Sequence, residues 1–175
     1  VNCREAWEIY PEAGDPEIIV AVLDEGVMWN HPDLAANMWV NEDEEYASKE
    51  DNDGNGYAGD RYGYNFVKNS PVICWSENYD TGHGTHVAGT IAAVNNNGIG
   101  VSGVAGGNAA KGVPGVKLMS CQMFKHGNNG KDVSGDGARA IKWGADNGAV
   151  ISQNSWSYTD ATSMPSYCAE AIDYF

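Results

Sequence analysis

The chain alternates between continuous apolar runs and segments in which apolar residues recur every three or four positions. The run from Ile18 to Leu23 is apolar throughout and rich in β-branched residues, which is typical of a strand buried on both faces of a parallel sheet. Further strands are predicted at Tyr62 to Val67, Lys117 to Phe124 and Ala149 to Ser155. Helices are predicted over residues 4–12, from His83 to about Val94, from Gly135 to Asn147 and from near Met164 to Phe175, with a turn and short helix over residues 30–39. This order predicts an α/β fold with a mostly parallel sheet.

The length of 175 residues corresponds to one domain, which can bury about 70% of the surface that its unfolded chain exposes. A parallel sheet that stops after the last predicted helix would leave a strand edge exposed. We therefore expect residues 1–175 to be the N-terminal part of a larger domain, truncated before its C-terminal half. No run approaches the roughly 18 apolar residues that cross a membrane, and the sequence has no signal-peptide pattern.

The chain is strongly acidic, with 10 basic and 24 acidic side chains and a net charge of −14. Much of the excess lies between Glu42 and Asp53. An acidic surface repels phosphate, so we expect no binding to nucleic acid or to anionic membranes. The acidic stretch itself has two interpretations, a solvated surface or a cation site.

The four cysteines leave the disulfide question open. They are Cys3, Cys74, Cys121 and Cys168, which allow three pairings that spacing does not distinguish. Without a Cys-x-x-Cys pair, a zinc or redox site is not expected. Cys121 lies in an apolar run and is predicted to be a buried thiol.

Two of the three groups of a Ser-His-Asp arrangement have a recognisable setting. Asp24 ends the buried run, and Gly26 allows the chain to leave sharply. His83 opens a predicted helix of small residues, with His86 one turn later as a supporting residue. A serine nucleophile needs a neutral imidazole as base, and the imidazole needs a carboxylate that fixes its tautomer. Because a helix N-terminus carries positive potential, we expect the pKa of His83 to be lowered.

At these residues the chain resembles the subtilisin-like serine proteases, or subtilases. That family carries an aliphatic strand ending in Asp-x-Gly, then His-Gly-Thr-His-Val-Ala-Gly, a Ser-x-Gly segment and a distant Gly-Thr-Ser-Met-Ala. Residues 20–27 match the first motif and residues 83–90 the second, while residues 31–34 (His-Pro-Asp-Leu) and 112–118 are similar to further family segments. The resemblance implies a subtilisin-like three-layer fold and a serine endopeptidase with Asp24 and His83 as acid and base, in the chain order of subtilisin.

The resemblance also implies positions that bind the peptide substrate. Ser155, Trp156 and Ser157 correspond to a wall of the primary specificity pocket, with Ser157 where glycine is usual. Asn129, Gly130 and Lys131 lie near the strand that would pair with an extended substrate as an added strand. A propeptide partner and a secreted, periplasmic or cell-surface location are likewise implied.

Two parts of the family pattern are not found in these 175 residues. No Ala-Gly-Asn segment follows Ser155, and Gly-Thr-Ser-Met-Ala does not occur. The segment from Thr162 to Pro165 lacks the preceding glycine and the long apolar helix, so we interpret Ser163 as a helix N-cap. We therefore expect this chain to be inactive alone, with the missing half of the domain supplying the nucleophile and the oxyanion hole. The alternatives are a calcium-stabilised pseudoprotease or binding module, and a fragment that self-associates through its open sheet edge.

The segment from Asp51 to Asp60 spaces oxygen-bearing residues in the way that calcium loops do. Side chains of Asp51, Asp53 and Asn55, the carbonyl of Tyr57 and a closing carboxylate from Asp60 are the predicted ligands of Ca²⁺, with glycines for the turn. An EF-hand would need glutamate where this chain has Tyr62, so the loop is of another kind. Larger subtilases often carry a similar Asp-Gly-Asn-Gly-Tyr insertion, and the resemblance implies a structural calcium ion.

Overall fold

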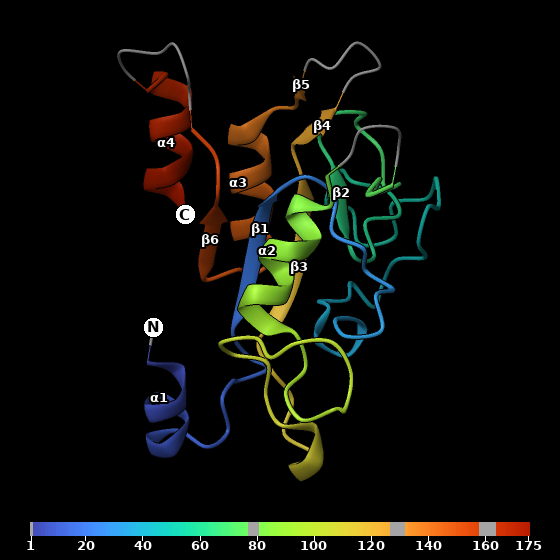
Figure 1. Cartoon of the computed structure of the whole chain (residues 1–175). Helices are drawn as coiled ribbons and strands as arrows, with labels where there is room; N and C mark the ends of the chain where they lie inside the picture. Colours follow the sequence, from blue (N-terminus) through green and yellow to red (C-terminus); the bar gives the residue numbers. More distant parts are fainter. Residues whose placement is uncertain (1, 77–80, 127–131, 158–163) are drawn as a thin grey trace.

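A four-stranded parallel sheet forms the centre of the molecule, with the strand order β2-β3-β1-β6 (Figure 1). The computed structural model describes residues 2–76, 81–126, 132–157 and 164–175. The strands are β1 (Ile19–Asp24), β2 (Gly63–Asn65), β3 (Lys117–Gln122) and β6 (Ile151–Asn154). Every neighbouring pair runs parallel, which confirms the predicted parallel sheet.

Residues of the central strand alternate between two cores, one on each face of the sheet. Even-numbered residues of β1 from Val20 pack with α2 (His83–Ala92). The odd-numbered residues Ala21 and Leu23 pack with α3 (Gly137–Asp146). Figure 1 shows α2 in front of the sheet and α3 behind it. This period of two, with both faces buried, is the physical reason for the continuously apolar run in the sequence.

The remaining elements flank this three-layer centre. They are α1 (Cys3–Ile9), α4 (Ser166–Tyr174), the 3₁₀ turns η1 (Ala35–Asn37) and η2 (Ala109–Lys111), and the antiparallel pair β4 (Phe124–His126) and β5 (Asp132–Ser134). Among the described residues, none of the helices has the length and apolar character needed to cross a bilayer.

The strand expected to end at Phe124 in fact leaves the sheet at Gln122. The ladder with β1 closes at the pair of Asp24 and Gln122, after which the Met123 amide donates to the Asp24 carbonyl at 2.9 Å. Phe124 then starts the β4–β5 hairpin, which the sequence analysis did not predict. Over residues 30–39 the expected short helix is a single 3₁₀ turn.

A buried carboxylate ties the acidic loop, residues 41–60, to the core. Asp60 is fully buried and accepts hydrogen bonds from Asn41 Nδ2 at 2.8 Å, Asn55 Nδ2 at 2.9 Å and Trp143 Nε1 at 3.0 Å. Burial raises the pKa of Asp60, and these three hydrogen bonds oppose the rise. Because Trp143 belongs to α3, its indole joins the loop to the helix that covers one face of the sheet.

Replacing Trp143 by phenylalanine tests this anchor. The ring would still fill most of its buried site, but Asp60 would lose one donor in an environment closed to water. We expect the Trp143→Phe chain to lose about 1–3 kcal/mol in free energy of unfolding, measured by urea titration. Trp7→Phe is the matched control, because Trp7 Nε1 donates to the exposed Val104 carbonyl at 2.8 Å, which can bond to water instead. Equal losses in the two variants would contradict the anchor.

Candidate active site

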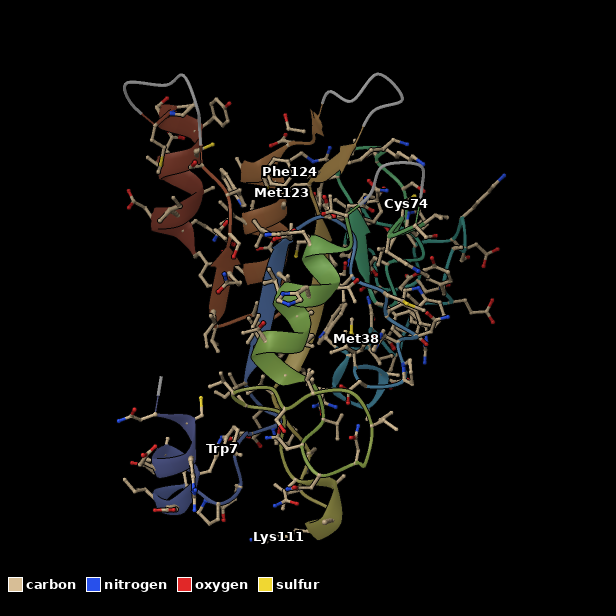
Figure 2. The ribbon with its side chains drawn as sticks, viewed as in Figure 1. Trp7, Met38, Cys74, Lys111, Met123 and Phe124 are labelled. Carbon is tan, nitrogen blue, oxygen red and sulfur yellow. The ribbon has the colours of Figure 1, made fainter. Side chains whose placement is uncertain are left out.

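The ends of β1 and β6 and the start of α2 meet at one edge of the sheet, the upper edge in Figure 1. Asp24 is the last residue of β1, His83 is the first of α2, and Ser155 directly follows β6. Met123 and Phe124, labelled in Figure 2, follow β3 at the same edge. Carboxyl ends of parallel strands are the usual place for a ligand site in an α/β sheet.

Asp24 and His83 form a short hydrogen bond between Oδ1 and Nδ1, 2.7 Å apart. The Asp24 side chain is 4% exposed and that of His83 is 49% exposed, so the acid lies behind the imidazole. A carboxylate can only accept, so Nδ1 carries the proton and Nε2 of the neutral ring is left with its lone pair. This is the tautomer in which the imidazole can accept a proton from another group.

The two pKa values shift upward for different reasons. Burial raises the pKa of Asp24, against the hydrogen bond from His83. The hydrogen bond to Asp24 raises the pKa of His83, and the negative charge of the same carboxylate adds to the rise. The lowered pKa expected from the helix dipole is therefore wrong, because a charge in direct contact outweighs the partial charge of a helix end.

Glu25 is a member of the site that the sequence analysis missed. It is only 7% exposed, and its carboxylate accepts hydrogen bonds from Thr81 Oγ1 at 3.0 and 3.1 Å and from the His83 backbone amide at 3.1 Å. The feature of the sequence that could have indicated this role is that a second acid, Glu25, directly follows Asp24. It acquires meaning only when the start of α2 is known to lie against the end of β1.

The close approach of α2 to β1 depends on Gly84. A Cβ on Gly84 would lie 2.2 Å from the carbonyl oxygen of Glu25, a distance that real atoms do not reach. Next to it, Thr85 Oγ1 accepts from the Met28 amide at 2.9 Å and holds the chain that leaves β1. Position 84 therefore has no room for a side chain. His86, further along the helix, is exposed.

A pocket of about 320 Å³ opens at this edge and brings together the predicted catalytic pair and the predicted wall of the specificity pocket. Its lining comprises Asp24, Glu25, Thr81, His83, Phe124, Lys125, Ser155, Trp156 and Ser157. A larger cavity of about 920 Å³ between the β4–β5 hairpin, α3 and α4 shares Phe124, Trp156 and Ser157 with it. Phe124 and Trp156 form an edge-to-face pair with centroids 5.6 Å apart and so stand between the two spaces.

Two of the predictions fall outside the residues that the structure describes. Asn129, Gly130 and Lys131 lie between the ends of β4 and β5, in the gap from 127 to 131. Ser163 lies in the gap from 158 to 163. The N-cap residue of α4 is Pro165, so the interpretation of Ser163 as the N-cap of the last helix is wrong.

In the acidic loop, the structure brings Asp51 and Asp53 together with Glu44. One carboxylate oxygen of each lies within 4.8 Å of the others. Glu44 is 1% exposed and also accepts from the Gly59 amide at 2.7 Å. Glu44 lies seven residues before Asp51, outside the segment from Asp51 to Asp60 whose spacing predicted the calcium ligands.

The other predicted calcium ligands, Asn55, Tyr57 and Asp60, lie outside the three-carboxylate group. Asn55 Oδ1 accepts from the Tyr57 amide at 2.8 Å, and Asn55 Nδ2 donates to Asp53 at 3.0 Å and to Asp60 at 2.9 Å. The ring of Tyr57 packs against Tyr64, with centroids 4.9 Å apart. The Asp60 carboxylate is directed toward its amide and indole donors instead of joining the three-carboxylate group.

Comparison with known proteins identifies the family to which the chain belongs. Residues 15–175 match the Subtilase family, so the chain belongs to the subtilisin-like serine proteases.

Three relatives illustrate the match. Subtilisin-like protease 1 of Plasmodium vivax is 37% identical over 148 residues, which cover 83% of this chain and 21% of that protein. The halolysin-like extracellular serine protease Nep of Natrialba magadii is 33% identical over 156 residues, covering 86% of this chain and 22% of its own. The crystal structure of fervidolysin from Fervidobacterium pennivorans, described as a keratinolytic enzyme related to subtilisin, superposes with a TM-score of 0.55 at 31% identity, covering 98% of this chain and 21% of that one. The chain thus spans about a fifth of the length of these relatives.

Two glycines on α2 provide a matched test of the close approach. Gly84→Ala forces the helix away from Glu25, and we expect a loss of about 1–3 kcal/mol in free energy of unfolding, as for other overpacked sites. Gly89→Ala, where a Cβ meets nothing within 4 Å, is expected to gain about 0.5–1 kcal/mol because alanine loses less backbone entropy in a helix. Thermal or urea unfolding of both variants measures the difference. A neutral Gly84→Ala chain would show that the contact is not tight.

Proposed function

We propose that this chain supplies the acid and the base of a serine endopeptidase, Asp24 and His83. The observation that carries the proposal is the 2.7 Å hydrogen bond from His83 Nδ1 to the buried Asp24 carboxylate, at the rim of a pocket. Membership of the subtilase family supports the same chemistry. The nucleophilic serine and the oxyanion-hole donor come from the C-terminal half of the domain.

The chemistry follows from the tautomer. When a serine hydroxyl attacks the carbonyl carbon of a peptide bond, Nε2 of His83 accepts the hydroxyl proton, and the Asp24 carboxylate stabilises the imidazolium that forms. His83 then gives the proton to the leaving amine. Water repeats the sequence on the acyl-enzyme, with His83 as base again. In this scheme Asp24 keeps its charge throughout and holds Nδ1 in place.

The substrate is a peptide held in extended form beside the pocket. Ser155, Trp156 and Ser157 line the pocket next to His83, which supports a role for them as a wall of the primary specificity site. The neighbouring cavity of about 920 Å³ offers room for a further side chain of the peptide. Ser157 in place of glycine adds a hydroxymethyl group to this wall and narrows the backbone approach there.

The names of relatives support a location outside the cytoplasm. One of them is named as an extracellular serine protease, and this chain shares its family. We propose a secreted, periplasmic or cell-surface location and a propeptide that accompanies folding.

Labelling with a serine-directed fluorophosphonate, read by intact mass, tests the proposed activity. The 175-residue chain alone should take no label. The chain expressed with the sequence that its gene encodes on either side should take one label and hydrolyse peptides, and His83→Ala in that protein should lower kcat by about 10⁴-fold or more.

Two results would contradict the proposal. A label on the 175-residue chain itself, at Ser163 for instance, would mean that it contains its own nucleophile. A longer protein that takes no label and cleaves no peptide would favour the alternative of a pseudoprotease or binding module.

We further propose that the acidic loop binds a structural calcium ion. Glu44, Asp51 and Asp53 offer carboxylate oxygens close together, and hard oxygen donors are the ligands that calcium prefers. Asn55 and the Tyr57 carbonyl are the additional candidates. Like charges held this close repel each other, so a divalent cation bound between the three carboxylates would remove the repulsion and stabilise the loop.

Calcium should therefore raise the melting temperature of the chain, and a chelator should reverse the rise. Saturation at 100 times the dissociation constant corresponds to about 2.7 kcal/mol of stabilisation. Asp53→Asn should abolish the shift, whereas Asp43→Asn, the same charge change at an exposed neighbouring position, should keep it. An unchanged melting temperature at saturating calcium would rule out the site.

A further inference from the structure

We propose that Glu25 is a positioning residue for His83: its carboxylate fixes the start of α2 and places a second negative charge beside the imidazole. The role in catalysis rests on the proposed function, in which His83 accepts the serine proton. The effect on the imidazole itself does not, because it follows from contacts within this chain.

The geometric part of the role comes from the hydrogen bonds of the Glu25 carboxylate. It accepts from the His83 backbone amide at 3.1 Å, one of the amides that a helix start leaves without a partner in the helix. It also accepts from Thr81 Oγ1 at 3.0 and 3.1 Å, and the His83 amide lies 3.2 Å from the same hydroxyl oxygen. The N-cap residue of α2 is Gly82, which has no side chain to cap the helix. Glu25 therefore supplies from β1 the cap that α2 lacks.

Glu25 contacts both members of the proposed catalytic pair, Asp24 and His83. The Glu25 amide donates to Asp24 Oδ1 at 2.7 Å, the same oxygen that His83 Nδ1 contacts at 2.7 Å. The backbone of Glu25 thus orients the acid while its side chain orients the base. A residue with a short or apolar side chain at position 25 could do the first but not the second.

The electrostatic part of the role comes from the charge that the carboxylate adds. Asp24 and Glu25 are 3% and 7% exposed, so water screens them weakly, and both favour the imidazolium. The hydrogen bond to Asp24 has the largest influence on the raised pKa of His83, and the charge of Glu25 acts in the same direction. Glu25 likewise raises the pKa of Asp24 through repulsion between the two carboxylates.

The other charged groups near His83 leave this direction unchanged. Among the described residues that line the pocket, Lys125 of β4 is the remaining charged side chain, and its ammonium opposes protonation of His83. Ser155, Trp156 and Ser157 after β6 carry no charge, and His86 lies on an exposed part of α2. Two buried carboxylates against one partly buried ammonium leave the pocket negative, which stabilises the imidazolium formed during proton transfer.

Titration of His83 by NMR tests the proposal in the full 175-residue chain, without any need for activity. The imidazole Cε1–H signals of the four histidines are followed against pH, with His83→Gln used to assign the His83 signal. Glu25→Gln keeps the shape and the acceptor oxygen but removes the charge, so the titration midpoint of His83 should move to lower pH. Glu17→Gln removes the same charge from an exposed position just before the start of β1. At 3.3 Å per residue this position is about 20 Å from Asp24 at the end of the strand, so the midpoint of His83 should stay unchanged.

A midpoint in Glu25→Gln equal to that of the wild-type chain would overturn the proposal. If Glu25→Gln does not fold by circular dichroism, Glu25→Ser supplies the same test, since it removes the charge with a small polar side chain, and its midpoint should also fall. Glu25→Asp retains the charge and should keep the midpoint near that of the wild type. Fluorophosphonate labelling reports on the nucleophile and not on this titration, so failure of the proposed function would be seen separately.

Discussion

The hydrogen bond between Asp24 and His83 depends on how closely the start of α2 approaches the end of β1. Three features make that distance possible: the lack of a side chain at Gly84, where a Cβ would lie 2.2 Å from the Glu25 carbonyl; the hydrogen bond that the Met28 amide donates to Thr85 Oγ1; and the hydrogen bond that the first amide of the helix donates to the Glu25 carboxylate. Each acts on the same junction from a different direction. Because the bond between the acid and the base is 2.7 Å long, a displacement of α2 by even a fraction of an ångström would weaken it.

The acidic loop is joined to this junction through the core. Asp60 receives the indole N–H of Trp143, and Trp143 packs in the core that also contains Leu23, the residue before Asp24. The loop is therefore fixed to the core, because its buried Asp60 carboxylate accepts a hydrogen bond from α3, the helix that packs against the sheet. A cation held by Glu44, Asp51 and Asp53 would reduce the repulsion within the loop and so strengthen this connection from the outside.

The sequence predicted the sheet and the pair of polar groups at its edge well, because both arise from local patterns. A short continuous apolar run rich in β-branched residues favours a doubly buried strand, and an acid at its end then lies at the carboxyl edge of the sheet. The β4–β5 hairpin was missed because Phe124 continues the apolar pattern of β3, and nothing in that pattern shows that the ladder with β1 ends at Gln122. Glu25 and Glu44 were missed for a related reason. Their partners lie 58 and at least 7 residues away, and no periodicity reports such contacts.

The site also has a thermodynamic consequence that follows from its charges. Since the folded pKa of His83 is raised above its unfolded value, protonated His83 stabilises the fold below the unfolded pKa, and this contribution is lost as pH rises through the folded pKa. Burial also raises the pKa of Asp24. Ionising this carboxylate therefore lowers the stability of the fold as pH rises from its unfolded pKa to its folded pKa. Both groups therefore make the fold less stable as pH rises, each between its own unfolded and folded pKa. Above the folded pKa of His83 the imidazole is neutral, the form that can accept a proton. The burial that places Asp24 behind the imidazole therefore costs stability when the carboxylate is ionised, and the contacts around Gly84 and Glu25 hold the pair together despite that cost.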